Sequence, residues 1–204
     1  MRKQLSKFEL SDKYSLFVFD LDNTLYDERD YLYNGYKEIA KNLVGAFPSK
    51  LADEYYDYLK AEFDAKGRFL LFNKFIEHFS LPVSVESLLQ ILRNQSTQIQ
   101  MFPKSKEILD VLLNANKKVY ILTNGNVMQQ RNKVSLLGLD NEYSSIGIVY
   151  ASLYESKPSP VTLLNIINHT SIEKNDAIMI GDSEVDKQTA YNANIDFINI
   201  KDII

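Results

Sequence analysis

The chain has 204 residues, of which 45% are hydrophobic and 25% charged, a balance typical of a folded globular protein rather than a disordered one. Its formal charge of -4 gives no excess of basic residues for binding nucleic acid or an anionic membrane. The absence of cysteine excludes disulfides, thiolate metal sites and a cysteine nucleophile, and only 2 histidines argue against a histidine-rich zinc site.

The sequence shows no pattern typical of a signal peptide or of a membrane-spanning helix. The first residues are polar and do not form the continuous apolar stretch of a signal peptide. No window approaches the ~18 consecutive apolar residues of a membrane-spanning helix. We therefore expect a cytoplasmic protein with neither a membrane nor a nucleic acid as partner.

The first predicted element is a strand over Ser15–Asp20, a β-branched and aromatic run that ends in aspartate. About 75 residues without a good strand pattern follow it, up to Met101. Helical patterns cover this stretch, at Tyr31–Val44, Ser49–Phe63, Phe69–Phe79 and Val85–Leu92. A connection this long is not a structureless loop, so we predict a helical subdomain inserted after the first strand.

Strands and helices alternate in the rest of the chain. The predicted strands are Lys118–Thr123, Ile146–Tyr150, Ala177–Asp182 and Phe197–Ile200, and the predicted helices are Lys104–Asn114, Val127–Leu137, Pro160–Asn168 and Asp182–Asn192. This alternation predicts an α/β fold with a doubly wound, parallel, Rossmann-like sheet. The expected domains are an α/β core over 1–26 and 98–204 and a helical cap subdomain over 27–97.

Polar side chains follow the predicted strands where each one ends. These residues are Asp20 and Asp22; Thr123, Asn124 and Gly125; Lys157; and Asp182 and Asp186. Each pattern alone is typical of a turn or a helix cap. Ligands of a doubly wound sheet bind at the carboxyl ends of its strands, so the joint occurrence predicts one site.

Four motifs carry a resemblance to a known family. They are FDLDNTLYD at Phe19–Asp27, ILTNG at Ile121–Gly125, SKPSP at Ser156–Pro160 and IGDSEVD at Ile180–Asp186. With these motifs the chain resembles the haloacid dehalogenase superfamily of hydrolases, in its phosphatase-type branch. The helical insertion after the first motif is similar to the small helical cap of one large subgroup.

The resemblance implies a role for each catalytic candidate. Asp20 is the expected nucleophile, which forms an aspartyl phosphate. Asp22 is the expected general acid and base. Thr123, with the backbone of Asn124 and Gly125, is expected to hold the phosphoryl oxygens, while Lys157 neutralises their charge.

The four acids of these motifs, together with a substrate phosphate, favour a hard divalent cation with oxygen ligands, and magnesium (Mg²⁺) is the common one. Asp20 and Asp182 are the expected direct ligands. Asp22 is expected to contribute its backbone carbonyl, by analogy with the family. Asp186 is expected either to act through a water molecule or to orient Lys157.

A basic turn in the predicted cap contains Lys66 and Arg68. Such a turn is usually a solvated surface, but on a cap it is also placed to meet an anionic substrate. We therefore include Lys66 and Arg68 as candidate substrate-binding residues.

The expected function is Mg²⁺-dependent hydrolysis of a small phosphorylated metabolite through an aspartyl phosphate, by a monomer or a weak homodimer. Two alternatives on the same fold are a phosphomutase and a 2-haloacid dehalogenase. A non-catalytic phospho-acceptor or binding module is an alternative of another class. A receiver domain, however, has its acids, threonine and lysine in a different order along the chain, and the intact acid set counts against a catalytically dead module.

Overall fold

The computed structural model describes residues 12–46 and 52–203. The chain divides into two compact units, one formed by residues 1–27 with 99–204 and the other by residues 28–98. The second unit lies in the chain where the sequence predicts an inserted helical subdomain. Its role as a cap remains a prediction.

The first unit is built on a five-stranded sheet in which all pairs are parallel, in the order β3-β2-β1-β4-β5. Its strands are β1 Leu16–Phe19, β2 Lys118–Thr123, β3 Gly147–Tyr150, β4 Ala177–Gly181 and β5 Asp196–Asn199. The prediction of an α/β fold with a parallel sheet is confirmed. Each predicted strand lies within one or two residues of an observed one.

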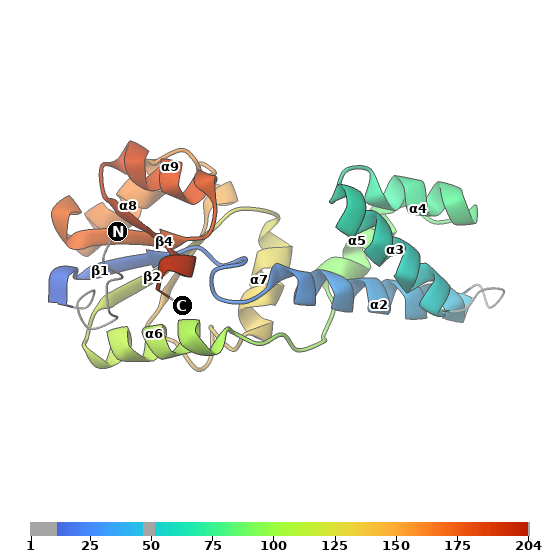
Figure 1. Ribbon diagram of the computed structural model, residues 1–204, viewed down its shortest axis with the longest axis horizontal. Helices are drawn as coiled ribbons and strands as arrows, with labels where there is room; N and C mark the ends of the chain where they lie inside the picture. The colour runs from blue at the N-terminus through green and yellow to red at the C-terminus, as the bar shows by residue number, and fades with distance from the viewer. Residues whose placement is uncertain (1–11, 47–51, 204) are drawn as a thin grey trace. The chain divides into compact units, whose positions relative to one another are not determined.

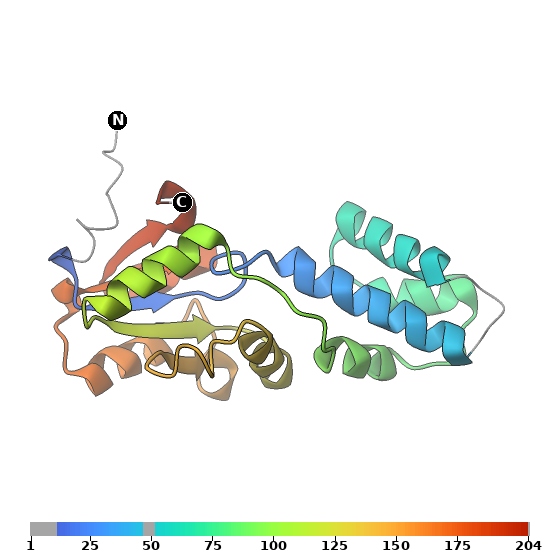
Figure 2. The same ribbon diagram turned by 90° about the horizontal axis from the view of Figure 1, so that it is seen from below.

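Helices cover both faces of this sheet (Figures 1 and 2). They are α6 Pro103–Asn114, α7 Val127–Leu136, α8 Val161–Thr170 and α9 Glu184–Ala193. Figure 1 shows α6 on one side of the strands and α8 and α9 on the other. One core cluster joins apolar side chains of β1 and β4 to Leu163, Ile166 and Ile167 of α8 and Ala190 of α9. Short 3-10 turns lie at Ala151–Leu153 (η1), Lys174–Asp176 (η2) and Ile200–Asp202 (η3).

The central strand β1 determines where the site forms. All four of its residues are fully buried, as expected for a strand covered on both faces. Phe19 is in register with Ile121 of β2 and with Ile180 of β4. The residues that follow β1, β2 and β4 therefore emerge side by side at one edge of the sheet.

The second unit consists of helices α2 Glu28–Ala46, α3 Ala52–Lys66, α4 Leu71–Phe79 and α5 Val85–Arg93. The predicted start of the second helix, Ser49, lies outside the described residues. Helix α4 begins at Leu71 rather than at the predicted Phe69, because Leu70 has a left-handed backbone conformation with φ of 53°. Edge-to-face contacts of Tyr55 with Phe75 and Phe79 pack α3 against α4.

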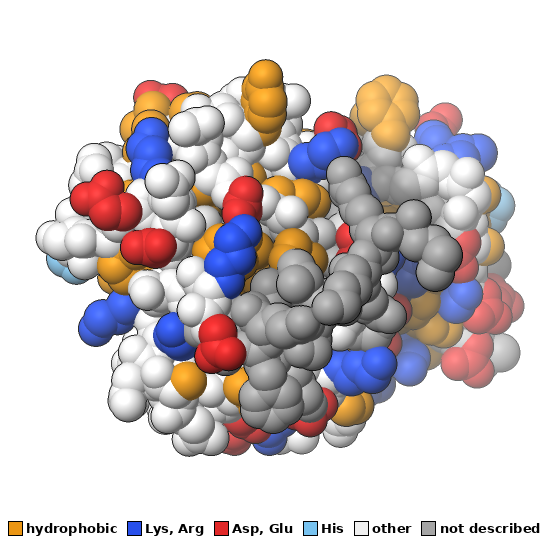
Figure 3. Space-filling view, turned by 60° about the vertical axis from the view of Figure 1, so that its left-hand side comes forward, with side chains coloured by type: hydrophobic (Ala, Val, Ile, Leu, Met, Phe, Trp, Pro, Cys, Tyr) orange, Lys and Arg blue, Asp and Glu red, His pale blue; other side chains and the backbone are white. Residues whose placement is uncertain are grey.

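Two observations bear on partners. No helix among the described residues is long and apolar enough to cross a bilayer. On the face drawn in Figure 3, basic and acidic side chains are interspersed rather than gathered by sign. The mixed charges agree with the mild net charge of -4, and the absence of a nucleic-acid partner remains a prediction.

Candidate active site

Lys157 joins two of the predicted acids in the interior of the first unit. Its ammonium group donates to Asp20 Oδ1 at 2.5 Å and to Asp186 Oδ1 at 2.6 Å. The Lys157 side chain is 3% exposed, so the charges meet in a low-dielectric environment. Burial alone would lower the pKa of Lys157, but the charges of Asp20 and Asp186 outweigh it and raise the pKa above its ordinary value.

Asp186 has protein partners at both carboxylate oxygens. Oδ1 accepts from Lys157, and Oδ2 accepts from the backbone N–H and hydroxyl of Ser183. Ser183 in turn caps α9 by accepting from the Asp186 backbone N–H, which completes a capping box. Of the two roles that the sequence left open for Asp186, this geometry supports orientation of Lys157.

Gly181, the last residue of β4, lies so close to Asp186 that a side chain has no room. A Cβ atom at Gly181 would lie 2.6 Å from Cβ, Cγ and Oδ2 of Asp186. We expect Gly181→Ala to displace Asp186, to destabilise the fold by about 1–3 kcal/mol and to lower kcat. Urea unfolding and steady-state kinetics measure both effects. Gly45→Ala is the control, because a Cβ atom there meets nothing within 4 Å. An unchanged kcat in Gly181→Ala would contradict the close contact between Gly181 and Asp186.

Asp20, Asp182 and Asp186 form an acidic cluster. Each offers a carboxylate oxygen, and these oxygens lie within 4.8 Å of one another. Burial, reinforced by Asp186 and opposed by Lys157, raises the pKa of Asp20 to about 7. Burial also raises the pKa of Asp182, and the charge of Asp186 adds to the effect.

This donor set suits a divalent cation. Carboxylate oxygens are the ligands that Mg²⁺ prefers, and a cation would relieve the repulsion that raises these pKa values. Asp20 and Asp182 are the residues that would hold it. Asp186 has both oxygens engaged by protein donors and would act through Lys157.

The raised pKa of Asp20 predicts how metal binding depends on pH. A carboxyl that keeps its proton in the folded state up to about pH 7 contributes stability below its unfolded pKa. That contribution is lost as pH rises through the folded value. Mg²⁺ competes with the proton for the carboxylate, so we expect Mg²⁺ to raise the Tm more at about pH 8 than at about pH 5.5. Thermal unfolding with and without Mg²⁺ at the two pH values measures this difference in Tm. Asp182→Asn should weaken the rise in Tm at both pH values. A larger rise at the lower pH would contradict the prediction.

Asp22, two residues after the predicted nucleophile, has donors on both of its oxygens. Lys133 Nζ lies 2.7 Å from Oδ1, the Tyr26 hydroxyl lies 2.5 Å from Oδ1, and Gln130 Nε2 lies 2.9 Å from Oδ2. Burial would raise the pKa of Asp22, but the charge of Lys133 and the three hydrogen bonds outweigh it and lower the pKa. The side chain is thereby held as a carboxylate.

The residues at the end of β2 and just after it are tied to this centre and to the Lys157 loop. Thr123 Oγ1 accepts from Gln130 Nε2 at 2.5 Å. The Asn124 side chain donates to the Lys157 carbonyl at 3.0 Å and accepts from the Lys157 backbone N–H at 2.9 Å. Gly125 has a φ of 113°, and its carbonyl accepts from Ser152. The structure thus brings Thr123 and Asn124 beside Asp22 and Lys157, and their contact with phosphate remains a prediction.

Taken together, one edge of the parallel sheet carries a carboxylate after the central strand, a second carboxylate two residues later, a buried lysine and further acids. A family model for haloacid dehalogenase-like hydrolases matches residues 17–200, a range that includes all of these residues. The chain belongs to this family.

Several known proteins are similar to this hydrolase in sequence or in fold. A human protein named N-acylneuraminate-9-phosphatase is 25% identical over 195 residues, which cover 87% of this chain and 78% of the relative. A HAD-superfamily hydrolase from Geobacter sulfurreducens shares the fold with a TM-score of 0.65 at 20% identity, covering 92% of this chain and 87% of that one. A Thermotoga maritima protein assigned as a β-phosphoglucomutase has a TM-score of 0.63 at 15% identity, covering 89% and 82%.

Two candidate residues of this hydrolase lie in the second unit, where each has an acidic partner. Lys66 pairs with Glu62 at 3.1 Å within α3. Arg68 lies 2.5 Å from Glu28 at the start of α2. Part of the positive charge of this turn is therefore neutralised within the unit, and substrate contact by Lys66 and Arg68 remains a prediction.

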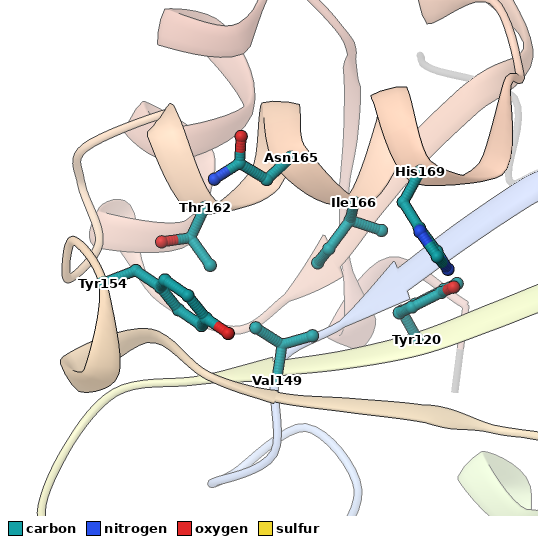
Figure 4. A pocket seen from close by; sticks show the side chains of 7 residues that line it. All are labelled: Tyr120, Val149, Tyr154, Thr162, Asn165, Ile166 and His169. Carbon is teal, nitrogen blue, oxygen red and sulfur yellow. The ribbon is translucent and has the colours of Figure 1, made fainter.

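A pocket of about 190 Å³ lies apart from the acidic cluster, between α8 and strands β2 and β3 (Figure 4). Its lining consists of Tyr120, Val149, Tyr154, Thr162, Asn165, Ile166 and His169. None of the predicted site residues lines it. The loop that carries Lys157 is tied to α8, because the Thr162 hydroxyl donates to the Glu155 carbonyl at 2.7 Å.

Sequence reasoning missed the residues that hold Asp22. Tyr26 belongs to the first motif but received no role, and Gln130 and Lys133 lie in a helix outside the motifs. The only local signal was their spacing, because residues three apart share one face of a helix. Both are almost fully buried, at 2% and 1% exposure, which is unusual for these polar side chains.

Proposed function

We propose that this hydrolase is a Mg²⁺-dependent phosphatase that cleaves a small phosphomonoester through an aspartyl phosphate on Asp20. The observation that carries the proposal is the pair of carboxylates at the end of β1. Asp20 is held by a buried ammonium group at 2.5 Å, and Asp22 is held by its own set of donors. Two fixed carboxylates in different environments suit a nucleophile and a separate proton-transfer group.

In the first step, an Asp20 oxygen attacks phosphorus and the bond between phosphorus and the leaving-group oxygen breaks. Asp22, in its acid form, gives its proton to that leaving oxygen, so the product is a neutral alcohol. The negative charge of the bound phosphate raises the pKa of the nearby Asp22 and opposes the effect of Lys133. Lys157 neutralises charge on the transferring phosphoryl oxygens.

In the second step, a water molecule attacks the acyl phosphate. Asp22, now a carboxylate, takes the proton of that water, and the bond between Asp20 and phosphorus breaks to release inorganic phosphate. Both carboxyl groups then return to their starting protonation states. A bound Mg²⁺ would supply further charge neutralisation at the phosphoryl oxygens.

The arrangement of Asp22 favours a phosphatase over a 2-haloacid dehalogenase. Halide leaves without needing a proton, so a dehalogenase has little use for an acid at this position. Three donors hold Asp22 here, and the acidic cluster around Asp182 suits a cation that carbon–halogen cleavage does not require.

A screen of purified protein against a panel of phosphomonoesters, with and without Mg²⁺, tests the proposal. The panel contains sugar phosphates, nucleoside monophosphates, small phospho-acids and an N-acylneuraminate 9-phosphate, the last because of the name of the human relative. We expect Mg²⁺-dependent release of inorganic phosphate from at least one class. Turnover of a haloacid, or transfer of phosphate within a sugar without release, would assign one of the alternative reactions instead.

A further inference from the structure

A buried lysine on α7 contacts Asp22. Lys133 Nζ lies 2.7 Å from Asp22 Oδ1, and the Lys133 side chain is only 1% exposed. Taking a lysine fully out of water costs free energy unless an opposite charge compensates it. The pair therefore stays together in the folded protein, and α7 fixes the position of one Asp22 oxygen.

The amide of Gln130 engages the other oxygen. Gln130 Nε2 donates to Asp22 Oδ2 at 2.9 Å and to Thr123 Oγ1 at 2.5 Å. Gln130 and Lys133 lie three residues apart and so share one face of α7. A single amide group thus links the predicted proton-transfer residue to the predicted phosphoryl-binding hydroxyl.

Tyr26, in the loop after β1, is the third residue that donates a hydrogen bond to Asp22. Its hydroxyl donates to Asp22 Oδ1 at 2.5 Å, and its side chain is fully buried. Because both oxygens of Asp22 have donors, any rotation of the carboxylate breaks at least one of these contacts.

We propose that Lys133, together with Gln130 and Tyr26, positions Asp22 for its two proton transfers. The inference rests on the proposed phosphatase function and goes beyond it, because it assigns a role to residues on α7 outside the four motifs. Lys133 acts through Asp22 and touches no reacting atom. Its contribution is geometric, since proton transfer requires the carboxylate within hydrogen-bond reach of the leaving oxygen and then of the water.

This role predicts a specific kinetic signature. A misplaced Asp22 slows departure of a leaving group that needs a proton and leaves a good leaving group almost unaffected. It also slows hydrolysis of the acyl phosphate, whichever ester formed it. A purely structural role would instead lower all rates by the fraction of protein that fails to fold.

Phenyl phosphate and 4-nitrophenyl phosphate are the probes, because they differ by one nitro group and 4-nitrophenolate leaves more easily. The rate of phenol or nitrophenol release in a single turnover is measured with Mg²⁺ present. The amount of acid-stable phosphoenzyme is measured in the steady state. The variants are Lys133→Met, Lys133→Arg and Gln130→Met, with Lys106→Met as the matched change at an exposed position of α6.

For Lys133→Met we expect phenol release to slow by at least about tenfold more than nitrophenol release. Phosphoenzyme should accumulate with the nitrophenyl ester above the wild-type level. Gln130→Met should show the same pattern, Lys133→Arg should recover part of the loss, and Lys106→Met should match the wild type. If Lys133→Met does not fold, Tyr26→Phe, which removes one hydroxyl, carries the same test.

Equal slowing of both esters without phosphoenzyme accumulation would overturn the positioning role while leaving the phosphatase proposal intact. Unchanged rates in Lys133→Met would do the same. If the wild type releases neither phenol nor nitrophenol and no phosphate from the metabolite panel, the proposed function fails and this inference fails with it.

Discussion

Replacing Asp20 by asparagine is expected to lower kcat by about 10⁴-fold or more, because an amide is a poor nucleophile and the covalent step is lost. The amide keeps the size of the carboxyl group, so Lys157 retains its contact with Asp186 at 2.6 Å. Steady-state kinetics on 4-nitrophenyl phosphate measure the effect, and circular dichroism verifies that the variant is folded.

The matched control for this change is Asp140→Asn, at an exposed turn after α7. It removes the same charge outside the site and should retain wild-type kcat. Normal turnover in Asp20→Asn would show that another residue is the nucleophile.

The second large effect is expected from Lys157→Met. This change removes an ammonium group that contacts Asp20 at 2.5 Å and Asp186 at 2.6 Å. The two buried carboxyl groups then lose the positive charge of Lys157. Removing one partner of a buried ion pair typically costs about 3–5 kcal/mol of stability. Losing one charge that stabilises the transition state typically lowers kcat by about 10²–10³-fold.

Urea unfolding and kinetics on the folded fraction separate these two effects of Lys157→Met. Lys187→Met, whose lysine is exposed and pairs with Glu184 at 3.4 Å, is the control and should leave both quantities unchanged. A folded Lys157→Met variant with wild-type kcat would contradict the role of Lys157 in charge neutralisation.

The sequence predicted the sheet well, because buried parallel strands are short apolar runs that end in polar residues. The observed β1 and β4 lie within Ser15–Asp20 and Ala177–Asp182. The grouping of Asp20, Lys157 and Asp186 was also predictable, since residues at the carboxyl ends of parallel strands meet at one edge. The individual contacts were not, and the engagement of both Asp186 oxygens appears only in the structure.

The contacts of Gln130 and Lys133 with Asp22 could not be predicted from the sequence, for a physical reason. Gln130 and Lys133 are 108 and 111 residues away from Asp22 along the chain, and no local pattern encodes such a contact. The start of α4 was missed for a local reason, because it depends on the backbone conformation of Leu70 alone. A left-handed conformation at a leucine is uncommon and has no sequence signal of its own.

The most direct test of an aspartyl phosphate on Asp20 uses Asp22→Asn and a substrate with a good leaving group and a radiolabelled phosphoryl group. Attack by Asp20 needs little proton transfer with such a substrate, whereas hydrolysis of the acyl phosphate lacks its base. After acid quenching and digestion, the label should lie on the peptide that contains Asp20 in Asp22→Asn and be absent from Asp20→Asn. Label on a serine, threonine or histidine, or no label in Asp22→Asn despite phosphatase activity of the wild type, would contradict the mechanism.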